Sequence, residues 1–102
     1  MMISEIIKLV AVRYGVTRKE MTAQDRCRRL SRVRHIAMYL ASWDGHGPAA
    51  IGRAISRDAT TVSHGLKRIG ELMADLDSLR GEIEKLHSQI EEMNSQKRER
   101  AA

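Results

Sequence analysis

The most constraining feature of this 102-residue sequence is a run of apolar residues near its C-terminal end. Their spacing alternates between three and four residues without a fault, which is the heptad pattern of an α-helix with one apolar seam. The seam consists of Ile69, Leu72, Leu76, Leu79, Ile83, Leu86, Ile90 and Met93. An unbroken seam favours a parallel two-stranded coiled coil, so we expect a homodimer through these residues. The alternative is that Asp75 or Asp77 caps a new helix, which folds back on its own domain.

The rest of the chain is also predicted to be helical. Only 3% of its residues are aromatic and none is Phe, which suits helices packed on helices better than a β-sheet. Gly15 is a candidate C-cap and Thr17 a candidate N-cap. Apolar periodicity predicts helices near 3–14, over 18–21 and near 30–42. The fold class is therefore all-α.

The clearest break in the chain is the segment WDGHGP at 43–48, which holds two glycines and the only proline. Pro48 suits the first turn of a short helix with the sequence PAAIGRAI. Asp58 is a good N-cap for a second helix that begins at 59. Two helices joined by about three residues form a helix-turn-helix.

Charge is divided unevenly along the chain, whose net charge is +5. Residues 1–70 carry thirteen Lys and Arg against five Asp and Glu, which gives +8, and residues 71–102 carry five against eight, which gives −3. We therefore expect a polyanion-binding domain over 1–74 and a separate, mildly acidic amphipathic helix over 75–102, with a frayed basic end. The alternative for the basic part is an ordinary solvated surface.

The second helix of this helix-turn-helix begins with short hydrogen-bonding side chains at Asp58, Thr60 and Thr61. A helix in the major groove needs such side chains at its N-terminal end, where its backbone approaches the bases. Threonine can bond a base edge or pack its methyl group on thymine, and aspartate can accept from cytosine. The side chains that can reach phosphates one turn later are those of His64, Lys67 and Arg68. The alternative is that Asp58 is only a cap and the threonines are surface residues.

The segment SRDATTVSHGLKRI, with IGRAI before it and RCRRLSRVRHIAMYLA upstream, resembles the C-terminal DNA-binding domain of the bacterial replication initiator DnaA. That family carries a signature of the form G-R-D-H-T-T-V-x-H-A. The matching residues are Arg57, Asp58, Thr60, Thr61, Val62 and His64. The resemblance extends from about Ile3 to Leu86. It implies a helix-turn-helix of the Trp-repressor type and a sequence-specific double-stranded DNA-binding protein that regulates replication initiation or transcription.

The resemblance also implies roles for individual residues. Asp58 and Thr60 would lie at base edges in the major groove, and Thr61 and His64 would meet phosphates. Arg26, in the loop before the third helix, matches an arginine that enters the adjacent minor groove. The positions that match other phosphate contacts are Arg28, Arg34, His35 and Pro48.

Four departures from the family pattern bear on specificity. Ala59 stands in place of the signature histidine, and the turn before Arg57 is one residue shorter and lacks the Gly-Gly. Val33 replaces a proline, and Asp25 replaces a basic residue. We therefore expect DNA binding with altered recognition of the standard initiator box.

Other functions find little support in the sequence. It contains no Gly-x-x-x-x-Gly-Lys-Ser/Thr segment, so we expect no nucleotide site; if the chain is complete, it is a DNA reader without the ATPase motor. We expect no catalytic residues, metal or cofactor, because no pair of its four histidines has metal-ligand spacing and none has a nearby nucleophile in a plausible pocket; Ser63 and His64 would point to different sides of a helix. One cysteine, no signal peptide and no membrane span predict a cytoplasmic, nucleoid-associated protein. The rival interpretation is a protein-interaction module that acts through the heptad helix.

Overall fold

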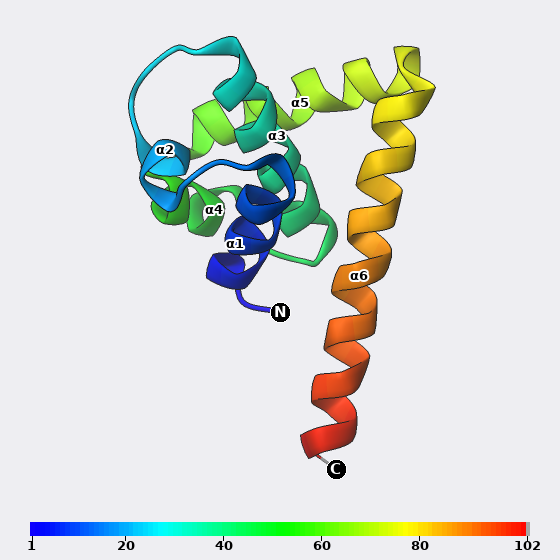
Figure 1. Ribbon diagram of the computed structural model, residues 1–102. Helices are drawn as coiled ribbons and strands as arrows, with labels where there is room; N and C mark the ends of the chain where they lie inside the picture. Colours follow the sequence, from blue (N-terminus) through cyan, green and yellow to red (C-terminus); the bar gives the residue numbers. More distant parts are fainter. Residues whose placement is uncertain (102) are drawn as a thin grey trace.

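The computed structural model describes residues 1–101, and within them the chain forms six α-helices and no β-strand (Figure 1). The helices are α1 (Ile3–Tyr14), α2 (Arg18–Thr22), α3 (Arg28–Trp43), α4 (Pro48–Ile55), α5 (Ala59–Asp75) and α6 (Asp77–Ala101). The predicted all-α class is confirmed, and α3 begins earlier than expected, at Arg28. Ala102, the last residue of the expected C-terminal segment, lies outside the described residues.

Several helices begin or end at the residues that local sequence signals predicted. Gly15 ends α1 in the left-handed conformation with φ of 67°, and the Thr17 side chain caps α2. Pro48 occupies the first turn of α4. The Asp58 carboxylate accepts a hydrogen bond from the Thr61 N–H at 2.7 Å and so caps α5. The Thr17 and Asp58 side chains satisfy N–H groups that a helix start leaves without a backbone partner, and the Gly15 N–H donates to carbonyls at the end of α1.

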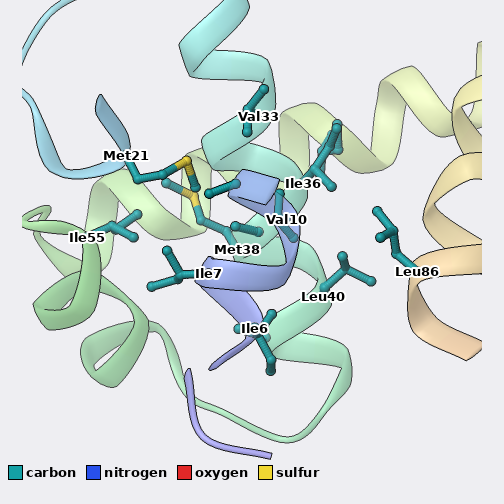
Figure 2. Close-up of a cluster of buried hydrophobic side chains, with 14 of the residues drawn as sticks. Ile6, Ile7, Val10, Met21, Val33, Ile36, Met38, Leu40, Ile55 and Leu86 are labelled. Carbon is teal, nitrogen blue, oxygen red and sulfur yellow. The ribbon is translucent and has the colours of Figure 1, made fainter. Parts of the chain in front are cut away.

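The hydrophobic core is centred on α3, which packs against α1 and α5. Figure 2 shows Ile6 and Val10 of α1 directed toward the same cluster as Ile36 and Leu40 of α3. Each of these side chains is at most 1% exposed. Burial of an aliphatic side chain of this size stabilises a fold by about 1.5–3 kcal/mol.

The structure corrects the prediction of one unbroken C-terminal helix. α5 ends at Asp75, Leu76 has extended backbone angles of −120° and 99°, and α6 begins at Asp77. α6 then runs back alongside the domain (Figure 1). The α6 residues buried by this arrangement are Leu79, Ile83, Leu86 and Ile90. The chain therefore buries most of this seam within its own domain, which is the alternative of a helix that folds back, while Leu76 and Met93 stay exposed.

Polar and aromatic contacts fasten α6 along its length. The Tyr14 hydroxyl donates to Glu82 Oε2 at 2.9 Å. Burial, together with this acceptor, raises the pKa of Tyr14 to about 12. The Trp43 ring stacks on the His87 ring with centroids 3.4 Å apart. The remaining pairs are Asn94 with Asp44 at 2.9 Å and Lys97 with Glu5 at 2.7 Å.

Candidate nucleic-acid interface

The helix-turn-helix consists of α4, a turn over 56–58, and α5. Ser56 ends α4 with φ of 60° and ψ of 46°, an uncommon conformation for a residue with a side chain. The Arg57 N–H donates to the Gly52 carbonyl at 2.8 Å, and a Cβ atom at position 52 would overlap the Arg57 carbonyl oxygen. Gly52 and a left-handed serine therefore close this turn without the Gly-Gly of the family.

α5 presents one face to the core and the opposite face to solvent. Val62, Gly65 and Ile69 are buried, at the spacing that places residues on one side of a helix. The exposed residues at the start and along the outer face are Asp58, Ala59, Thr60, Thr61, His64, Lys67 and Arg68. The residues predicted to contact DNA from this helix thus lie together on its accessible surface.

Asp58 has two roles at the start of α5. Hydrogen bonds from Thr61, first from its backbone N–H, hold the pKa of the Asp58 carboxyl below its ordinary value. The group is therefore an ionised hydrogen-bond acceptor at neutral pH. It caps the helix and stays exposed, so the cap and base-edge interpretations of this residue are compatible.

α3 crosses α5 closely at Gly65. A Cβ atom added there would lie 2.8 Å from Met38 Sδ and 2.9 Å from His35 Cδ2. The family signature has alanine at this place, so the glycine of this chain leaves room for the His35 ring. The crossing places His35 against the buried face of α5, at the edge of depressions that also include Thr61 and Arg68.

Arg57 is half-buried and fixes the loop over 23–27. Its Nη2 donates to the Ala23 carbonyl at 2.6 Å, and its Nη1 donates to the Ile55 carbonyl at 3.2 Å. Gln24 Nε2 adds a second link by donating to the Ser56 carbonyl at 2.9 Å. These bonds join the loop to the turn of the helix-turn-helix.

The loop carries Arg26, which is exposed as predicted. A cleft lies between the loop and the N-terminal end of α5, and its lining includes Arg26, His35 and Thr61. Arg26, His35 and Thr61 therefore meet at one surface depression, although they come from three different segments. Pro48 is also exposed, at the opening of α4, where helix N-terminal amides can meet an anion.

Arg34 is placed differently from the prediction, because its side chain is only 3% exposed. Its guanidinium donates to the Glu20 carbonyl at 2.6 Å and the Met21 carbonyl at 3.2 Å. It also pairs with Asp25 Oδ1 at 3.1 Å. The prediction that Arg34 contacts phosphate is therefore wrong, because its N–H groups donate to acceptors at the end of α2 and in the loop. Asp25, which replaces a basic residue of the family, supplies the carboxylate.

His35 lies between the cleft and a second cavity, whose lining includes Arg28, Ser31, Arg32 and Arg68. Burial, followed by the positive charges of Arg68, Arg32 and Arg34, lowers the pKa of His35. The ring is therefore uncharged at neutral pH.

Arg32 was missed by the sequence analysis. A usable signal was present, because residues four apart on a helix share a face, which places Arg32 next to Arg28.

The described residues contain no group of three or more His, Cys, Asp or Glu side chains able to hold a metal ion. No described helix is long and apolar enough to cross a membrane.

A family model, the bacterial dnaA protein helix-turn-helix, matches residues 3–69. The chain belongs to this family. The match contains α1 to α4 and most of α5, and so includes both the core and the exposed face described above. The DnaA helix-turn-helix of this chain thus has α4 as its first helix and α5 as its second.

Individual relatives agree with the family model. The chain is 40% identical over 74 residues to the chromosomal replication initiator protein DnaA of Cereibacter sphaeroides strain ATCC 17029. It is 37% identical over 80 residues to the chromosomal replication initiator protein DnaA of Rickettsia canadensis. The aligned stretches cover 71% and 76% of this chain, but only 16% and 17% of the two initiators. The chain thus spans about a sixth of the length of these relatives.

Proposed function

We propose that this DnaA-type module binds double-stranded DNA sequence-specifically, with the N-terminal turn of α5 in the major groove. The observation that carries the proposal is the exposed row of short polar side chains at the start of α5, at Asp58, Thr60 and Thr61. A large side chain at these positions would hold the helix away from the bases, whereas these side chains allow close approach.

Each part of the interface has a proposed role. Thr60 and Asp58 contact base edges, and Thr61 and His64 contact phosphates on the groove wall. Arg26 extends from the loop into the adjacent minor groove, where a narrow groove attracts arginine. The residues that add further phosphate contacts are Arg28, His35, Pro48, Lys67 and Arg68. Arg57 acts indirectly, by fixing the loop that carries Arg26.

We further propose that the module regulates replication initiation or transcription by occupying sites on the nucleoid or competing for them. The support is its membership of the DnaA helix-turn-helix family together with the strongly basic surface over 1–70. Counterion release from DNA would supply most of the non-specific affinity.

Ala59 predicts altered specificity. Its methyl group is exposed and can touch a thymine, but it has no atom that can hydrogen-bond to a base. Loss of one base contact lowers discrimination at one base pair by about 1–3 kcal/mol, or roughly tenfold to a hundredfold. We therefore propose weakened or changed recognition of the standard initiator box with phosphate contacts retained.

The proposal is tested by selecting bound sequences from a random duplex pool and then measuring affinity against salt. We expect affinity to fall steeply as salt rises. Thr60→Ala should lower affinity for the selected site by about 1–3 kcal/mol and leave affinity for scrambled duplex nearly unchanged. Equal losses on both duplexes would show that Thr60 does not read bases.

Ala59→His gives a gain-of-function arm to the same experiment. If α5 lies in the groove as proposed, the added ring should raise preference for the initiator box over scrambled duplex at fixed salt. Tight binding of the box by the wild type, with no gain from the histidine, would contradict the account of Ala59. No duplex binding at all would favour the protein-interaction function instead.

A further inference from the structure

We propose that the cavity at the crossing of α3 and α5 seats one further DNA phosphate, held by Arg32 and Arg68. The inference rests on the proposed function, because it assigns a second anchoring point on the same DNA. The cavity lies beside the cleft of Arg26 and Thr61, and its lining residues are Arg28, Ser31, Arg32, His35, Arg68 and Leu72.

The cavity concentrates positive charge that the chain itself does not neutralise. Arg28, Arg32 and Arg68 are all exposed, and none of them takes part in the ion pairs found among the described residues. The like charges of these side chains repel one another. An anion bound between them is attracted by all of them and offsets that repulsion. Arginine also presents a planar fork of donors that matches phosphate oxygens.

His35 supports the same interpretation from the side of the cavity. Burial and the nearby arginines lower its pKa, so its ring adds a neutral hydrogen-bonding group rather than a fourth positive charge. A half-buried neutral ring between exposed arginines can orient a phosphate oxygen without adding to the repulsion in the free protein.

The position of the cavity fits the geometry of DNA. It shares Ser31 and His35 with the cleft that contains Arg26 and Thr61, so the two depressions adjoin along α3. Successive phosphates of one strand lie about 3.4 Å apart along the helix axis. One strand that runs past His35 can therefore place a phosphate in each depression.

Spacing along α5 leads to the same place. Eight residues separate Thr60 from Arg68, which corresponds to about 12 Å of helix. The major groove is about 8.5 Å deep. A helix that inserts its N-terminal turn into the groove therefore carries Arg68 out of the groove, to the level of the phosphates.

The test compares two cavity variants and their double with a charge-matched control. Arg32→Gln and Arg68→Gln each remove one positive charge from the cavity, and Arg100→Gln removes one from the last turn of α6. We expect each cavity variant to flatten the slope of log affinity against log salt by about one unit, and the double variant by about two. The loss should be equal on selected and scrambled duplexes, and Arg100→Gln should keep the wild-type slope.

The outcomes separate this inference from the function on which it rests. If the wild type binds duplex but the double variant keeps its slope, the cavity assignment and the phosphate contact of Arg68 are overturned, while sequence-specific duplex binding through the start of α5 stands. A loss confined to the selected duplex would also overturn it, because that result indicates a base contact. If the wild type shows no salt-dependent duplex binding, the proposed function and this inference both fail.

Phosphate ethylation interference on the wild-type complex provides a readout that needs no variant. We expect interference at two neighbouring phosphates of one strand, one for each depression. Interference at only one of them would overturn the second anchoring point. Urea unfolding midpoints of the variants should match the wild type, because both arginines are exposed.

Discussion

α5 and α6 share one apolar heptad but use it differently. In α5 the seam is buried at Ile69, and the opposite face presents threonines and cations to solvent. In α6 the seam is buried at Ile83 and Ile90 against the same domain, and the helix completes the core. The comparison teaches that a heptad identifies which face of a helix is buried, and leaves open which surface buries it.

The two helices separate at Leu76, whose backbone groups bond to both helices. Its N–H donates to the Leu72 carbonyl at 2.9 Å, and its carbonyl accepts from the Arg80 N–H at 3.1 Å. The bend therefore leaves the hydrogen bonds of this residue satisfied and needs neither glycine nor proline. Each aliphatic side chain that α6 buries contributes about 1.5–3 kcal/mol to the free energy of unfolding. This gain outweighs the interruption of the helix at one residue.

The largest expected effect tests whether α6 belongs to its own domain. Ile83 is fully buried, so Ile83→Ala should lower the free energy of unfolding by about 2–5 kcal/mol. Leu76→Ala, at a residue that is 40% exposed, should lower it by less. Urea unfolding at two protein concentrations checks both values, and the midpoint should not depend on concentration. A midpoint that rises with concentration would restore the homodimer.

A second prediction contrasts the buried Arg34 with the exposed Arg68. Arg34→Gln removes donors from carbonyls at the end of α2, so it should lower the free energy of unfolding by about 1–3 kcal/mol. Arg68→Gln should change it by less than about 0.5 kcal/mol. Where both variants are folded, only the Arg68 variant should flatten the salt slope of DNA binding. A flattened slope with unchanged stability for Arg34→Gln would revive the phosphate contact.

The smallest expected effect compares two glycines within α5. Gly70 has open space around it, so Gly70→Ala should raise the free energy of unfolding by about 0.5–1 kcal/mol through helix propensity. Gly65→Ala should give no such gain, because the new methyl group would meet Met38 and His35. Thermal unfolding of the two variants decides the matter. An equal gain at both positions would mean that the α3–α5 crossing is looser than described.

The helix-turn-helix and its exposed face could be predicted from the sequence because their signals are local. Pro48 and Asp58 mark helix starts whatever surrounds them, and the apolar period of α5 leaves its polar residues outside. The burial of Arg34 could not be predicted in the same way, since it depends on the carbonyls of α2 and on Asp25. The bend at Leu76 was weighed but not favoured, because no breaker residue marks it and the heptad runs through it without a fault; the bend depends on how α6 packs on α1 and α3.

The central claim is that α5 and α3 bind DNA while α6 completes the fold. The most direct test is to titrate the labelled protein with a selected duplex and to follow its amide chemical shifts. We predict the largest changes in chemical shift over 58–64, and further changes at Arg26, Arg32 and Arg68. Amides over 82–97 should change little, because α6 lies on the other side of the core from the recognition turn. The largest changes along α6, with 58–64 unmoved, would contradict the account.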